Sequence, residues 1–158
     1  TIDDDDDWTT EAALAKANGA DHVVLTGEDL PAAVKKITGG AMVPVVYDSV
    51  GRDTFMASLD SLRRRGLMVS VGTASGTIPG FDPNLLAMKG SLYLTRPALA
   101  DYIADPAEKA QLADEVFGHV AQGRIRIEIN QRYALADAAQ AHRDLESRKT
   151  TGSSIFAI

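Results

Sequence analysis

The chain has 158 residues, of which 45% are hydrophobic and 24% are charged, so it suits one folded domain and is not disordered in general. Its net charge of -6 argues against a nucleic-acid partner. The absence of cysteine excludes a disulfide framework, a Cys-ligated zinc ion and a thiol nucleophile.

The N-terminus is strongly acidic, because five aspartates follow one another from Asp3 to Asp7. Signal and transit peptides carry the opposite charge, and no apolar run approaches the ~20 residues of a membrane span. We therefore expect a cytoplasmic protein with no membrane partner. A solvated terminus is the simplest interpretation of the aspartates, because a metal-binding loop would need a glycine turn and spaced ligands.

The first two thirds of the chain alternate between helical and extended patterns. The predicted helices are Thr9–Asn18, Asp29–Ile37, Asp53–Leu62 and Asn84–Met88. The predicted strands are His22–Leu25, Val43–Tyr47, Leu67–Val71 and Ser91–Thr95. Apolar strands that alternate with helices across short loops are typical of βαβ units on a parallel sheet.

The last third has a different character. A long helix is predicted over Pro106–Gln122, with Asp105 as its N-cap. Basic and apolar residues alternate over Arg124–Ile129, which predicts an edge strand with one wet face. A helix over Leu135–Ser147 and an apolar strand over Ser153–Ile158 complete the chain. The predicted fold class is α/β, with a Rossmann-like doubly wound parallel sheet.

Ligands of open α/β sheets bind beyond the carboxyl ends of the strands. Three such ends carry small, hydroxyl-bearing or cationic residues, namely Asp48–Gly51, Gly72–Gly76 and Thr95–Pro97. These residues let a backbone approach a flat ligand, although the same types are also common in ordinary turns.

No nucleophilic or metal-binding constellation is recognisable. The three histidines, His22, His119 and His142, lack metal-ligand spacing and are interpreted as surface or packing residues. Ser49 lacks the Gly-x-Ser-x-Gly elbow of serine hydrolases. The candidate chemistry is therefore ligand binding at the strand ends.

Several longer motifs, taken together, resemble one family. They are Val45–Thr54, Ser58–Leu62, Arg65–Ser70, Lys89–Pro97, Ala136–Glu146 and Arg148–Ser154. In this order they closely resemble the C-terminal half of the NADPH:quinone oxidoreductases, the zinc-free, zeta-crystallin-like branch of the medium-chain dehydrogenase/reductase superfamily. The resemblance runs from about Glu11 to Ile158.

The resemblance implies a specific domain organisation and activity. Residues 1–158 would form a partial NAD(P)-binding Rossmann domain, lacking its first strand and glycine-rich turn, plus the C-terminal segment of the catalytic domain. The GroES-like domain of the family would be absent. In the family, NADPH gives a hydride to a quinone or an activated alkene without zinc. The isolated chain is expected to have little or no activity.

The resemblance also implies which residues contact the dinucleotide. Ser49 and Val50 would lie beside its adenosine end, whereas Gly72, Thr73 and Ala74 would approach the nicotinamide. Backbone groups of Leu94, Thr95 and Arg96 would meet the carboxamide, and Arg148 would lie near the dinucleotide. No catalytic residue is assigned.

Two departures from the family bear on the cofactor. The chain contains no Gly-x-Gly-x-x-Gly, so the usual pyrophosphate cradle is missing from it. Where the family places a lysine for the 2′-phosphate, this chain has Asp7–Glu11, and a tyrosine of the family is Thr26 here. Either NADH is possible beside NADPH, since carboxylates repel that phosphate, or Thr1–Trp8 is not native sequence.

Two functional classes follow. The first is part of an NAD(P)H-dependent quinone reductase with a small-molecule quinone substrate. The alternative is a non-catalytic Rossmann-like module for dimerisation or interaction. In both cases a homodimer is expected to form through the edge strand Ser91–Thr95, with Leu92 and Leu94 partly at the interface.

Overall fold

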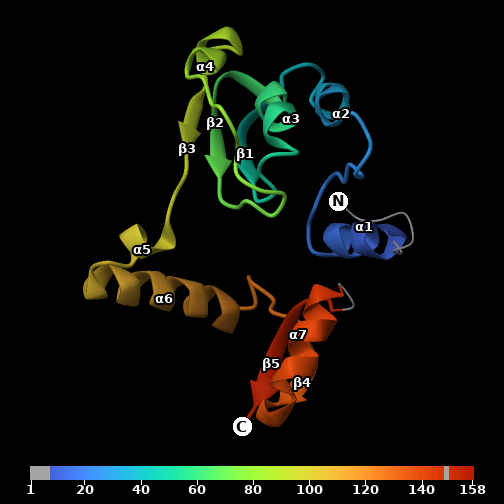
Figure 1. Ribbon diagram of the computed structural model, residues 1–158, viewed down its shortest axis with the longest axis vertical. Coiled ribbons are helices and arrows are strands. Elements are labelled where there is room, and N and C mark those ends of the chain that lie inside the picture. Colours follow the sequence, from blue (N-terminus) through green and yellow to red (C-terminus); the bar gives the residue numbers. More distant parts are fainter. Residues whose placement is uncertain (1–7, 148–149) are drawn as a thin grey trace. The chain divides into compact units, whose positions relative to one another are not determined.

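The computed structural model describes residues 8–147 and 150–158. The chain divides into two compact units, Thr1–Ala98 and Leu99–Ile158 (Figure 1). In both units the strands are parallel and alternate with helices, which confirms the predicted α/β class. Within the described ranges, no helix is long and apolar enough to cross a bilayer.

The first unit contains a three-stranded parallel sheet in the order β1-β2-β3. Its strands are β1 (Val43–Asp48), β2 (Leu62–Ser70) and β3 (Tyr93–Thr95). Its helices are α1 (Trp8–Ala17), α2 (Leu30–Ile37), α3 (Phe55–Asp60) and α4 (Asn84–Met88). Because the strands are parallel, the loops that follow β1 and β2 leave the sheet at the same edge.

The core of this unit lies where α3 packs on the sheet (Figure 1). Buried Phe55 and Leu59 from the helix meet Met68 of β2 and Leu92, which precedes β3. Leu92 is 6% exposed, so the sequence-based placement of this residue at a dimer interface is wrong. The exposed neighbour on the same edge is Tyr93.

The predicted strand over His22–Leu25 is wrong, because these residues are neither helix nor strand in the structure. Their apolar pattern resembles that of a strand, but a strand exists only where a neighbouring strand accepts and donates its hydrogen bonds. In the described residues this segment pairs with neither outer strand of the sheet, β1 or β3, so its backbone does not become a strand.

Helix α3 ends earlier, and β2 begins earlier, than the sequence predicts. Leu62 was expected to end the helix but instead pairs with Val43 and fills the core as the first residue of β2. Tertiary pairing of Leu62 thus overrides its helical propensity. A change of register between Val43 and Val45 accommodates the early start.

The second unit contains α5 (Leu99–Tyr102), α6 (Pro106–Ala121), β4 (Ile129–Ala134), the short 3₁₀ helix η1 (Leu135–Asp137), α7 (Ala138–Glu146) and β5 (Ser153–Ala157). Strands β4 and β5 pair in parallel, and η1 and α7 connect them. Asp105 caps α6 as predicted, because its Oδ1 accepts a hydrogen bond from the amide of Ala107 at 2.7 Å.

The strand predicted over Arg124–Ile129 is displaced along the chain, since β4 begins only at Ile129. Ile125 and Ile127, the apolar members of that pattern that precede β4, are 41% and 53% exposed. Pairing with β5 instead selects the next six residues, where Tyr133 is aligned with Phe156 and their rings pack together.

Replacing Leu59 with alanine tests the core. Leu59 is 1% exposed, so Leu59→Ala should lower the free energy of unfolding by about 2–5 kcal/mol. The matched control is Met56→Ala on the same helix, because Met56 is 49% exposed and its loss should cost about 0.5 kcal/mol. Urea unfolding measures both, and equal losses would contradict the packing of α3.

Candidate functional site

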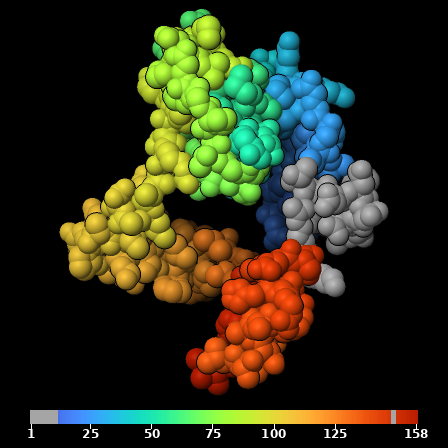
Figure 2. Space-filling view, in the orientation of Figure 1, coloured from blue at the N-terminus to red at the C-terminus, as the bar shows by residue number. Residues whose placement is uncertain are grey.

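The loops that follow β1 and β2 are joined along their backbones. The amides of Val71 and Gly72 donate to the carbonyl oxygen of Asp48 at 2.8 and 3.2 Å. Further along, the amide of Ser75 donates to the carbonyl oxygen of Val50 at 2.8 Å. The atoms of both loops adjoin at the surface of the first unit (Figure 2). Two predicted ligand loops therefore form one surface.

Two glycines permit this close approach. A Cβ atom on Gly72 would overlap the carbonyl of Ser49. A Cβ atom on Gly51 would lie 2.7 Å from the carbonyl oxygen of Gly76, and Gly51 also has a φ of +93°, which L side chains rarely adopt. Both positions therefore require glycine for packing between the loops.

The carboxylate of Asp48 holds the first of these loops. It lies at the end of β1, is 4% exposed, and accepts hydrogen bonds from the amides of Val50 and Gly51 at 2.8 and 2.9 Å. The hydroxyls of Thr54 and Ser58 donate to it at 2.8 and 2.7 Å. It therefore ties the turn to the start and middle of α3.

These bonds stabilise the charged form of Asp48. Burial by itself raises the pKa of this carboxyl, but the hydrogen bonds from Ser58, Gly51, Thr54 and Val50 together lower the pKa below its ordinary value. The carboxylate is therefore ionised at neutral pH and acts as an acceptor for four groups.

A first pocket, which we call the Val50 pocket, has a volume of about 390 Å³. One wall comes from the segment before α2, with Leu25 and Thr26 among its residues, and the other from Val50 and the start of α3. Its lining is mostly apolar, with carboxylates at Glu28 and Asp53. This shape and chemistry suit a flat, uncharged ring.

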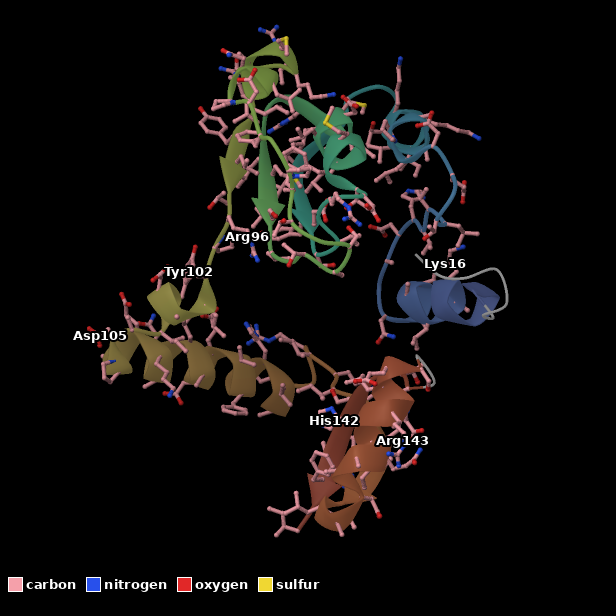
Figure 3. The ribbon with its side chains drawn as sticks, viewed as in Figure 1. Lys16, Arg96, Tyr102, Asp105, His142 and Arg143 are labelled. Carbon is pink, nitrogen blue, oxygen red and sulfur yellow. The ribbon has the colours of Figure 1, made fainter. Side chains whose placement is uncertain are left out.

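A second pocket, the Arg96 pocket, has a volume of about 250 Å³ and lies at the ends of β2 and β3. Thr73, Thr77 and Arg96 supply polar groups, and Phe81 and Leu94 are among its apolar walls. Arg96 follows β3 directly (Figure 3), and its Nη1 donates to the carbonyl oxygen of Ser70 at 2.9 Å. This bond anchors the only cation in the lining of the pocket.

The structure brings together some of the predicted contact residues. Val50 lines one pocket, whereas Thr73, Leu94 and Arg96 line the other. The remaining described candidates, Ser49, Gly72, Ala74 and Thr95, belong to the same loops and strand but line neither pocket. Arg148 lies outside the described residues.

Sequence reasoning missed several residues of these pockets, including Thr26, Asp53, Thr54 and Phe81. The first three were assigned to a strand end and a helix start, and their convergence depends on how α3 packs. A signal for Asp48 was available in the sequence. An aspartate shortly before a glycine, as in Asp48–Gly51, is typical of a turn in which the carboxylate accepts a backbone amide two residues further on. The histidines line neither pocket, in agreement with their structural interpretation.

Among the described residues, no group of three or more His, Asp or Glu side chains is arranged to hold a metal ion. The pockets therefore offer shape, hydroxyls and one cation, which suit an organic ligand with a flat ring. A zinc ion does not fit the donor set of this part of the chain.

This chain is similar over most of its length to known dehydrogenases and reductases. Residues 18–155 match the family described as zinc-binding dehydrogenase. A quinone oxidoreductase of Pseudomonas aeruginosa is 49% identical over 92% of this chain and 45% of its own length. A 2-haloacrylate reductase of a Burkholderia species is 37% identical over 92% of this chain and 44% of its own length.

Among solved structures, the Escherichia coli quinone oxidoreductase in complex with NADPH superposes with a TM-score of 0.87 and 47% identity. It aligns with 94% of this chain and 47% of its own length. The chain thus spans slightly less than half the length of the relatives that it matches. The similarity confirms the Rossmann-like fold that the sequence predicts.

The role of Asp48 predicts a specific pH dependence. Because its pKa is lower in the folded chain than the ordinary 3.8, its contribution to stability is complete above that value and is lost as the pH falls through the lowered pKa. At pH 7, Asp48→Asn should cost about 1–3 kcal/mol of unfolding free energy. Urea unfolding between neutral and strongly acidic pH measures this difference.

The difference in unfolding free energy between the wild type and Asp48→Asn isolates Asp48, because both proteins contain the other carboxylates. It should shrink steadily as the pH falls below the ordinary pKa of Asp48. A stability difference that does not change with pH would show that the charge of Asp48 is not what holds the loop.

Proposed function

The chain belongs to the zinc-binding dehydrogenase family, and from this membership we propose that it is part of an NADPH-dependent reductase of quinones or activated alkenes. The observation that carries the proposal is the pair of pockets in one unit, each with one wall from a loop at the carboxyl end of a parallel strand. The names of the P. aeruginosa and Burkholderia relatives support the two acceptor classes.

The residues of both pockets fit the two ends of a dinucleotide. The apolar walls of the Val50 pocket suit the adenine ring, and the carboxylates of Glu28 and Asp53 there disfavour a phosphate inside it. In the Arg96 pocket, hydroxyls of Thr73 and Thr77 can bind a carboxamide beside the apolar walls. When bound, NADPH supplies the hydride for reduction.

The chain's own residues would bind and orient the cofactor. Ser49, Gly72 and Ala74 offer backbone groups on the joined loops, and Thr95 and Arg148 remain proposed contacts. The Arg96 cation, fixed by its bond to Ser70, would favour electron-rich groups at the nicotinamide end. NADH remains a possible alternative, because the acidic lining gives the 2′-phosphate no evident partner in the Val50 pocket.

We further propose that the 158 residues alone bind the dinucleotide weakly and turn over little. The chain contains no Gly-x-Gly-x-x-Gly, so the backbone amides that usually cradle the pyrophosphate do not come from it. A dissociation constant in the micromolar range for the chain alone would contradict this proposal.

Filling the Arg96 pocket tests the binding site. Thr73→Trp places a large ring where the nicotinamide end would bind and should weaken NADPH binding by about tenfold or more, equivalent to about 1.4 kcal/mol. Ala87→Trp on α4, exposed and outside both pockets, is the control. Titrations followed by NADPH fluorescence measure both, with NADH in parallel. Equal affinity of the two variants for NADPH would show that the Arg96 pocket does not bind the nicotinamide end.

A second candidate function, a dimerisation module, is favoured by one observation on β3. This strand is at the edge of its sheet, and Tyr93 on it is 62% exposed. Unpaired backbone groups and an exposed aromatic ring at a sheet edge favour pairing with a second copy. The predicted homodimer would form there and is compatible with either function.

Tyr93→Asp should convert such a dimer to a monomer, because a charge would be buried between the paired edges. Light scattering measures the mass of both proteins. Leu92 is unsuitable for this test, because it is a core residue and a charge there would unfold the unit. A wild-type chain that is monomeric at high concentration would rule out the edge interface.

A further inference from the structure

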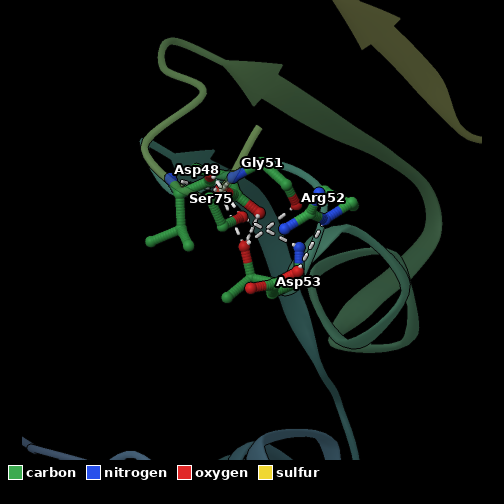
Figure 4. A network of polar contacts seen from close by, with 7 residues as sticks. Asp48, Gly51, Arg52, Asp53 and Ser75 are labelled. Carbon is green, nitrogen blue, oxygen red and sulfur yellow. Dashed lines mark hydrogen bonds and ion pairs between the residues drawn. The ribbon is translucent and has the colours of Figure 1, made fainter. Parts of the chain in front are cut away.

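Among residues 8–147 and 150–158, Ser75 is the side chain that bridges the two loops of the site by hydrogen bonds (Figure 4). It comes from the loop after β2, yet the two backbone atoms that its hydroxyl contacts belong to the loop after β1. Its Oγ donates to the carbonyl oxygen of Val50 at 2.9 Å and accepts from the amide of Asp53 at 3.0 Å. One hydroxyl therefore satisfies an acceptor and a donor on the opposite loop.

The partners of Ser75 belong to the Val50 pocket, because Val50 and Asp53 both line it. Thr73, two residues before Ser75 on the same loop, lines the Arg96 pocket. The hydroxyl of Ser75 thus lies on the connection between the two pockets but lines neither. It is placed to determine their spacing rather than to contact a ligand.

The backbone around Ser75 supports the same junction. The amide of Arg52 donates to the carbonyl oxygen of Gly76 at 3.1 Å, and the Ser75 amide donates to Val50. These bonds hold the loops side by side. The Ser75 hydroxyl adds the bridge that reaches Asp53, at the start of the segment leading into α3.

From this geometry we propose that Ser75 is a positioning residue that fixes the distance between the two pockets, so that one dinucleotide can occupy both at once. The inference rests on the proposed function, since it presumes a ligand with two ends. A ligand with two ends binds tightly because the second end binds at a high effective concentration once the first is bound. That gain requires a fixed spacing between the two sites.

The proposal predicts that Ser75→Ala affects binding of the whole dinucleotide more than binding of either half. Ser75→Ala should weaken NADPH binding by about tenfold, because the loops lose their fixed spacing. It should weaken adenosine 2′,5′-bisphosphate and nicotinamide mononucleotide by less than about twofold each, because each pocket keeps its own walls. Ser75→Thr keeps the hydroxyl and should restore NADPH binding, and Ser154→Ala, in the second unit, is the matched serine control.

Amide chemical shifts of the 158-residue chain, titrated with each of the three compounds, give dissociation constants even for weak binding. Hydrogen exchange of the Asp53 amide, which should be faster in Ser75→Ala, reports the loss of the bridge without any ligand. The expected result is faster exchange together with a selective loss for NADPH.

Each other outcome has a definite meaning. If Ser75→Ala weakens the two halves as much as NADPH, the residue is merely structural and the proposal is overturned. It is also overturned if NADPH binding or Asp53 exchange is unchanged. If the wild-type chain shows no shift with any of the three compounds, the proposed function itself fails. This outcome differs from a failure of the Ser75 proposal alone, in which the wild-type chain still binds.

Discussion

The buried carboxylate of Asp48 is the interaction on which the first unit's site depends. A charge can remain in such a place only when several donors replace the water it has lost. Here two backbone amides and the hydroxyls of Thr54 and Ser58 do so. The same bonds shape the turn after β1 and attach it to α3, so the end of the strand, the turn and the helix form one structure.

The joined loops extend this structure across the sheet. Once the turn after β1 has its shape, Gly51 and Gly72 let the next loop pack against it without side chains in between. The Ser75 hydroxyl then connects that loop to Val50 and Asp53. Each pocket takes one wall from this junction. Hydrogen bonds between the loops, together with the pairing of β1 and β2, therefore hold the walls that the two pockets take from this junction.

The first unit presents two pockets of different chemistry. It supplies an apolar pocket with a carboxylate rim and a second pocket with one anchored cation, and the chain's matches extend over less than half of each relative. Because Arg96 donates to the carbonyl of Ser70, its charge is directed toward the end of β2. The electrostatic contrast between the pockets is consistent with a ligand whose two ends differ.

The sequence by itself determined the parallel α/β class, most helices and the loops of the site, because apolar periodicity, caps such as Asp105 and strand-end glycines are local signals. The tertiary structure decided the rest. His22–Leu25 is not a strand and β4 starts only at Ile129, since a strand forms where a partner completes its hydrogen bonds. The convergence of Asp48, Ser75 and the pocket walls likewise depends on contacts between residues far apart in the chain, which no local pattern encodes.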